Sequence, residues 1–173
     1  MVVFAGCNAG NGPNAGSSNT TAHATRAHAV LAPASSSHVS GRLSFVATNQ
    51  GVHITGRISG LQPDSTHGFH IHANGDCGAP DASSAGGHFN PTQQPHGRPQ
   101  SGSHHAGDIP NQQANADGVA TVDTVVKGIE LGTGSNTDVL GRAVIVHAQP
   151  DDYTSQPSGN SGARIACGVI TRD

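Results

Sequence analysis

The side chains that usually build helices are scarce in this chain, and that scarcity constrains its fold more than any other feature. The 173 residues contain 14 Val and 8 Ile against 5 Leu, with a single Lys and a single Glu. Helices draw on Leu, Lys and Glu, whereas β-branched side chains favour strands. The 24 Gly and 10 Pro residues supply many turns. We therefore expect one loop-rich, all-β domain, and we exclude a helix bundle and a coiled coil.

Apolar side chains occupy every second position in the segments that we expect to be strands. Residues 39–47 and 52–58 show this alternation on either side of Asn49-Gln50-Gly51, which predicts a β-hairpin with one face toward a core. Strands separated by Gly and Pro predict a sandwich or a flattened barrel. The stretches 73–117 and 148–163 lack such periodicity, and connections that long are usually functional or held by something other than a core. Further strands are expected at residues 69–72, 119–126, 141–147 and 165–170.

Two histidines in one expected strand are the first sign of a metal site. His70 and His72 alternate with Phe69 and Ile71, so their rings share one face of the strand, roughly 7 Å apart. At that separation two imidazoles can converge on one ion. Taken alone, the pair is also explained by a polar strand face.

A second group of ligand-type side chains lies in the stretch without periodicity. His88, His96, His105 and Asp108 fall within 21 residues. Tetrahedral Zn²⁺ accepts His nitrogen and Asp oxygen, and a bound ion would order such a loop without a hydrophobic core. A solvated, His-rich loop is the alternative. The pair of histidines upstream and His147, at the end of an expected buried strand, favour the metal site.

Two cysteines lie in segments that a covalent link would bring together. Cys77 belongs to the first long stretch and Cys167 to the last expected strand. They form either a disulfide or two free buried thiols. A bridge would close a loop of about 90 residues, for which the chain-entropy model gives roughly 4–5 kcal/mol, and it would imply an oxidising compartment.

Six short strings in this sequence closely resemble the Cu,Zn superoxide dismutase family. They are GFHIH (68–72), GGHFNP (86–91), HAGD (105–108), GRAVIVH (141–147), PDD (150–152) and GARIACGVI (162–170). The likeness runs in family order from about His38 to the C-terminus. The close spacing of His72 and Cys77 and the short 148–163 loop look more like the bacterial, periplasmic branch. The resemblance implies a Greek-key β-barrel or sandwich of about eight antiparallel strands with two long functional loops.

The resemblance also implies a copper site and a zinc site that share one histidine. The implied copper ligands are His70, His72, His88 and His147, and the implied zinc ligands are His88, His96, His105 and Asp108. Asp151 would join the two sites, Arg164 would attract superoxide beside the copper, and Cys77 and Cys167 would form the family's disulfide. His104 is a spare residue beside the implied ligand. The other histidines, His23, His28, His38, His53 and His67, match no ligand and are expected at the surface.

The activity implied by the resemblance is dismutation of superoxide to O₂ and hydrogen peroxide at a copper redox centre with a structural zinc. In the family's ping-pong reaction, His88 would leave the reduced copper, take a proton and pass it to the product, while Arg164 docks the anion. Two rival functions are a metal-binding, non-catalytic relative (a chaperone-like domain or a copper buffer) and an adhesive sandwich with structural metals. The complete ligand set, Arg164 and the lack of a C-x-C motif favour the enzyme.

The first 37 residues differ in composition from the rest. Residues 1–7 resemble the end of a bacterial lipoprotein signal, and lipidation of Cys7 would tether the protein to a membrane outside the cytoplasm, in the periplasm or cell envelope. An accidental cysteine is the alternative. Residues 8–37 are expected to be a flexible linker before a domain over residues 38–173. A net charge of −3 without a Lys/Arg cluster excludes nucleic-acid binding, and both a homodimer and a monomer stay open.

Overall fold

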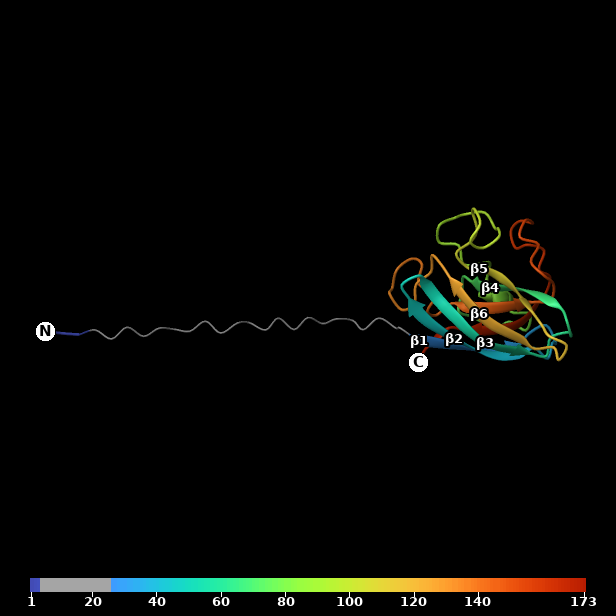
Figure 1. Cartoon of the computed structure of the whole chain (residues 1–173), viewed down its shortest axis with the longest axis horizontal. Coiled ribbons are helices and arrows are strands. Elements are labelled where there is room, and N and C mark those ends of the chain that lie inside the picture. The colour runs from blue at the N-terminus through green and yellow to red at the C-terminus, as the bar shows by residue number, and fades with distance from the viewer. Residues whose placement is uncertain (4–25) are drawn as a thin grey trace.

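Eight antiparallel strands curl into a nearly closed barrel, with a short ninth strand beside the first (Figure 1). The computed structural model describes residues 1–3 and 26–173. The all-β expectation is confirmed, and among the described residues no helix is long and apolar enough to cross a membrane. The elements are β1 (Arg26–Pro33), β2 (Ser40–Thr48), β3 (Gly51–Ser59), β4 (Thr66–His72), the 3₁₀ turn η1 (Ser83–Ala85), β5 (Asp108–Gln113), β6 (Ala120–Val126), β7 (Ala143–His147), β8 (Arg164–Val169) and β9 (Thr171–Arg172).

The strands follow a Greek-key order. Around the barrel they run β5-β4-β7-β8-β1-β2-β3-β6, so the connections from β3 to β4 and from β6 to β7 join strands that are not neighbours. The end strands β5 and β6 meet at a bridge between Ala114 and Ala120. The first long loop, residues 73–107, and the second long loop, residues 148–163, project on the same side of the barrel (Figure 1).

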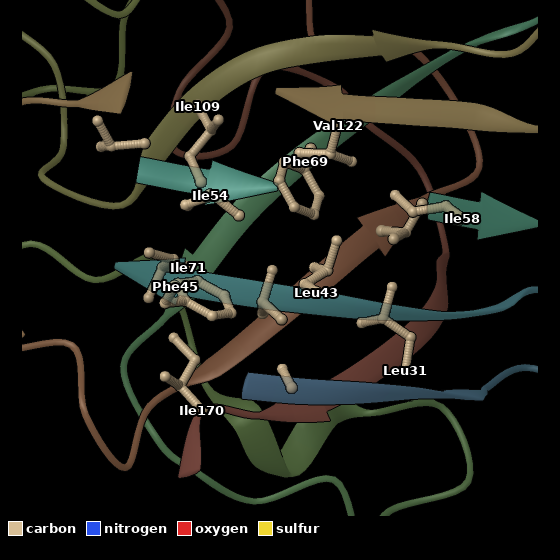
Figure 2. Close-up of a cluster of buried hydrophobic side chains, with 14 of the residues drawn as sticks. Leu31, Leu43, Phe45, Ile54, Ile58, Phe69, Ile71, Ile109, Val122 and Ile170 are labelled. Atoms are coloured by element: carbon tan, nitrogen blue, oxygen red, sulfur yellow. The ribbon is translucent and has the colours of Figure 1, made fainter. Parts of the chain in front are cut away.

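The core is built from the inward positions of each strand. On β2, Leu43 and Phe45 are fully buried while Ser44 between them is exposed, so the predicted hairpin of β2 and β3 is confirmed (Figure 2). Phe69 and Ile71 of β4 also point into this core. His70 and His72, which alternate with them, face the other side of the strand. That side is buried too, because the long loops cover it.

The N-terminal boundary predicted for the domain is wrong. Residues 26–33 of the expected linker form β1, which pairs with β2 along most of its length and with β8 through Ala32 and Pro33. The side chains of Ala27, Ala29 and Leu31 are buried in the core. The sequence signal was weak because alanine contributes little apolar surface. Linker residues 8–25 and the lipidation predicted at Cys7 lie outside the described residues.

The predicted long loop 73–117 also contains a strand. Asp108–Gln113 forms β5, which pairs with β4. Its sequence, DIPNQQ, has no clear alternation, and Pro110 is tolerated because β5 is an end strand of the sheet. The strand therefore gives residue 108 a fixed position on the barrel wall.

Candidate metal centre

Strand register assembles a first cluster of four histidines. His70 and His72 lie opposite Ile145 and Ala143 on β7, and a bridge between His72 and His88 brings the first long loop against β4. His147 ends β7. The ring nitrogens that His70, His72, His88 and His147 offer all lie within 4.8 Å of one another, and all four residues are buried.

Each of three rings in this cluster is oriented through one nitrogen, which leaves its other nitrogen free. His72 Nδ1 donates to the Gly86 carbonyl at 2.9 Å, and His147 Nδ1 faces the Gly162 carbonyl at 3.3 Å. The two Nε2 atoms left over are 3.4 Å apart. His70 is turned the other way, since its Nε2 donates to the Asp151 carboxylate at 2.8 Å. Hydrogen bonds of this kind fix the tautomer of a metal-binding imidazole.

A second cluster adjoins the first through His88. It consists of His88, His96, His105 and Asp108, whose ligand atoms also lie within 4.8 Å of one another. His88 Nδ1 donates to Asp108 Oδ1 at 2.8 Å. The backbone N–H groups of Gly97 and His105 donate to Asp108 Oδ2 at 3.2 and 2.8 Å. The carboxylate thus holds the first long loop at two further points.

Three buried ring nitrogens test whether metal ions fit these clusters. His70 Nδ1, His88 Nε2 and His96 Nδ1 have no hydrogen-bond partner, although burial of an unpaired polar atom is costly. His96 Nδ1 lies 3.1 Å from Asp108 Oδ2 without the geometry of a hydrogen bond. All three atoms belong to the clusters. These nitrogens would be paired if each bound a metal ion, so the two clusters have the side chains needed to hold two metal ions.

Asp151 connects the two clusters from behind. Its Oδ2 accepts from His70 Nε2 at 2.8 Å and its Oδ1 accepts from His96 Nε2 at 2.9 Å. The side chain of Asn111 holds the backbone of Asp151, donating to its carbonyl and accepting from its N–H, both at 2.9 Å. Gly159 packs against this carboxylate, since an added Cβ would lie 1.7 Å from Asp151 Oδ1. Asp151 is therefore rigidly placed.

Burial keeps three rings of the first cluster, those of His72, His88 and His147, neutral. Desolvation lowers the pKa of His88 to about 4 and the pKa of His147 to about 3. It also lowers the pKa of His72 well below its usual value, and repulsion from neighbouring rings adds to all three shifts. A neutral imidazole retains the lone pair that a metal ion requires.

The two carboxylates stay ionised despite their burial. Burial alone would raise the pKa of Asp108, but hydrogen bonds with His105 and His88 outweigh it and hold the pKa below its usual range. For Asp151, burial likewise acts to raise the pKa, and the hydrogen bonds with His70 and His96 outweigh it and lower the pKa. Each cluster is therefore provided with negative charge close to its imidazoles.

A pocket of about 410 Å³ opens from solvent onto the first cluster. Three histidines of that cluster and one arginine are among its lining residues: His72, His88, His147 and Arg164. The guanidinium is held by two carbonyls of the first long loop, donating to Ala82 O and Gly86 O at 2.7 Å each. Arg164 also lies opposite His147 in the register of β7 and β8. Partial burial lowers its pKa from the usual value for arginine.

Two residues that orient the site were not identified from the sequence. The prediction that His67 lies at the surface is wrong: it is 3% exposed, its Nδ1 donates to the His147 carbonyl at 2.7 Å, and its Nε2 lies 2.6 Å from Ser65 Oγ. The second residue is Asn111, which holds the backbone of Asp151. His67 immediately precedes the Gly68–His72 string, but nothing in a sequence shows that the ring turns inward. His104 lies outside both clusters, as expected.

The barrel and the site define a class of protein: a Greek-key protein with two adjacent clusters of metal-ligand side chains that share one histidine. The sequence model of the family described as copper/zinc superoxide dismutase (SODC) matches residues 39–170, and this chain belongs to that family.

Individual relatives come from plants and bacteria. Superoxide dismutase (Cu-Zn) 2 of Mesembryanthemum crystallinum is 45% identical over 140 residues, which cover 77% of this chain and 87% of the relative. Superoxide dismutase (Cu-Zn) 1 of Aquifex aeolicus is 41% identical over 133 residues, covering 75% and 79%. The crystal structure of a SOD-like protein from Bacillus subtilis has a TM-score of 0.74 at 41% identity, covering 82% of this chain and 95% of that one.

Proposed function

We propose that this protein catalyses the dismutation of two superoxide ions and two protons to O₂ and hydrogen peroxide, with bound copper and zinc. His70, His72, His88 and His147 would hold the copper, and His88, His96, His105 and Asp108 would hold the zinc. The observation that carries the proposal is the position of His88. Its ring belongs to both clusters, and its Nε2 is buried without a partner.

The donor sets match the two metals. Four imidazoles suit Cu(II), whereas three imidazoles and one carboxylate suit zinc in a closed structural site. Copper, when bound, supplies the one-electron chemistry that superoxide dismutation needs. Asp151 keeps His70 and His96 in the orientation that leaves one nitrogen of each free.

Arg164 and His88 act on the substrate. Superoxide is a small anion, and the Arg164 guanidinium lines the pocket that leads to the first cluster. Because two carbonyls fix the guanidinium, it binds the anion without first having to become ordered. His88, which lines the same pocket, takes a proton at Nε2 and delivers it to the reduced product.

The decisive experiment measures superoxide consumption by protein with analysed copper and zinc contents. We expect rapid consumption by the loaded protein and at least about a hundredfold loss in His147→Ala, which removes one copper ligand, while the partly exposed His53→Ala control keeps full activity. If protein with stoichiometric copper and zinc consumes superoxide no faster than free buffer, the chain is a metal-binding relative without this activity.

The proposal includes a location outside the cytoplasm. Cys77 and Cys167 form a disulfide with a Cα–Cα distance of 5.7 Å, and structural disulfides persist in oxidising compartments. The lipoprotein-like residues 1–7 support a tether at Cys7. Fractionation of cells that express the full chain tests this: the wild type should be found with membranes, and Cys7→Ser should be released. Equal release of both proteins would exclude the tether.

A further inference from the structure

The two long loops are joined by a side-chain amide that the proposed chemistry does not use. His96 N–H donates to Gln156 Oε1 at 2.9 Å, and Gln156 Nε2 donates back to the His96 carbonyl at 2.8 Å. One amide thereby pairs with both backbone groups of one residue, as a neighbouring strand would. Since His96 belongs to the second cluster, the contact ties the second long loop to a proposed zinc ligand.

The position of Gln156 in its loop gives this contact a consequence for the pocket. The next two residues, Pro157 and Ser158, line the pocket that also contains His147 and Arg164. Two hydrogen bonds around them run within the same loop, from Gly159 N to Ser155 O and from Ser161 Oγ to Ser158 O. Such bonds keep the local shape of a loop but do not fix its place on the barrel.

We propose that Gln156 is a positioning residue for the reaction, which sets the place of the Pro157–Ser158 wall by locking it to the backbone of His96. This inference rests on the proposed function, because the wall matters only if superoxide reacts in this pocket. Asp151 already links the loops through the His96 ring, and Arg98 stacks on Tyr153 with its guanidinium carbon 4.2 Å from the ring centroid. Both of those contacts precede residue 156, and beyond the wall Gly159 packs against Asp151 Oδ1 and His96 Nε2. Gln156, which is next to Pro157, adds hydrogen bonds to the first long loop directly beside the wall.

The structural alternative is that Gln156 merely supports the first long loop and helps it to hold zinc. The two roles differ in what moves when the amide is removed. A positioning role predicts that the wall loosens while both metals stay bound. A supporting role predicts zinc loss, with loosening of residues 86–107 and of the wall together.

The experiment compares Gln156→Ala with Gln94→Ala in protein loaded with copper and zinc. Gln94 lies in the first long loop, and its side chain bonds within that loop to the Thr92 carbonyl, so it is a matched control. Amide hydrogen exchange reports the order of residues 158–162, and titration with azide, a small anion, reports access to the copper without any turnover of superoxide.

For Gln156→Ala we expect full metal content, faster exchange of residues 158–162 by up to about tenfold, and azide affinity changed severalfold. The reason is that both hydrogen bonds to His96 are lost, together with a longer one to the Thr154 carbonyl. Gln94→Ala should match the wild type. A second variant, Gln156→Glu, keeps an acceptor for His96 N–H but loses the donor, and it should show a smaller increase in exchange.

Unchanged exchange and unchanged azide affinity in fully loaded Gln156→Ala would overturn the proposal. So would loss of zinc from both Gln156 variants with faster exchange throughout residues 86–107. Failure of the wild-type protein to consume superoxide would refute the proposed function. The exchange measurements would still show whether Gln156 fixes the wall, because they do not depend on turnover.

Discussion

His70 lies directly opposite Asp108 in the antiparallel register of β4 and β5. One residue of each cluster is therefore fixed by the same pair of strands. The barrel wall, and not the long loops alone, sets the separation of the two clusters. The loops bring in His88, His96 and His105 against this fixed pair.

Replacing Asp108 with Ala should remove zinc before copper. The change deletes the carboxylate of the second cluster and the acceptor that holds Gly97 N and His105 N, while every histidine of the first cluster remains. We expect zinc affinity to fall by more than about a hundredfold, together with a lower melting temperature. Metal analysis during a chelator titration measures both metals, with the exposed Asp123→Ala as the control. Wild-type zinc affinity in Asp108→Ala would show that the ligand set is wrong.

Arg164→Ala should slow dismutation without removing copper. The guanidinium is the positive group that lines the pocket, and its loss should reduce kcat/KM by about tenfold or more, equal to at least ~1.4 kcal/mol of transition-state stabilisation. Arg57→Ala, on the exposed side of β3, is the control. An Arg164→Ala protein with normal copper content and an unchanged kcat/KM would exclude the docking role.

The wild-type rate should fall gently as ionic strength rises. Long-range steering needs several cations around the channel, and it weakens with salt. Here Arg98 stacks on Tyr153, Arg142 lies over Phe89, and Lys127 lines two other pockets. With a net charge of −3 as well, attraction of superoxide should be local to Arg164. Stopped-flow rates between low and high salt test this, and a steep fall would mean that other cations steer the substrate.

Reduction of the Cys77–Cys167 disulfide should weaken both the fold and the substrate site. The bond joins the first long loop to β8, and the same loop supplies the carbonyls that hold Arg164. Loss of the cross-link should cost roughly 2–5 kcal/mol of stability. Thermal unfolding and kcat/KM, each with and without reductant, are the measurements. Two free thiols in the native, unreduced protein would contradict the prediction.

The metal-free protein should lose stability as the pH falls from about 6.5 to about 4. The folded-state pKa of His88 is about 4, whereas an unfolded histidine titrates near 6.5, so the unfolded chain binds its proton first. Below about pH 4 the folded protein binds the proton too, and this contribution stops changing. The shift corresponds to ~3 kcal/mol in order of magnitude, and His147 acts in the same direction. Denaturant melts at several pH values test it; equal stability at pH 7 and pH 5 would refute it.

Where the sequence carried a strong local pattern, it predicted the fold well. The β2–β3 hairpin was evident because Leu43 and Phe45 alternate with polar residues. β1 escaped prediction because two of its three buried positions are alanines, and β5 because Asp108 and Pro110 break the strand pattern. Both strands form because they pair with neighbouring strands. Those partners are distant in sequence, so a local pattern does not show the pairing.

The candidate site was predictable as a set of residues but not as an arrangement. The spacing of His70, His72 and the later ligand-type residues favours metal binding over a solvated, His-rich loop. Sequence spacing says nothing about which nitrogen of a ring is tied to an oxygen and which is free. That choice depends on contacts such as His67 with the His147 carbonyl, which join residues far apart in the chain.

The place of β1 between β2 and β8 limits where this protein can be cut. A chain that began at residue 38 would leave the backbone N–H and C=O groups of β2 and β8 unpaired along a seam in the barrel wall. Open strand edges of this kind pair with other molecules, so such a truncation would aggregate instead of giving a smaller barrel. A fusion partner at the N-terminal end must therefore be joined ahead of Arg26.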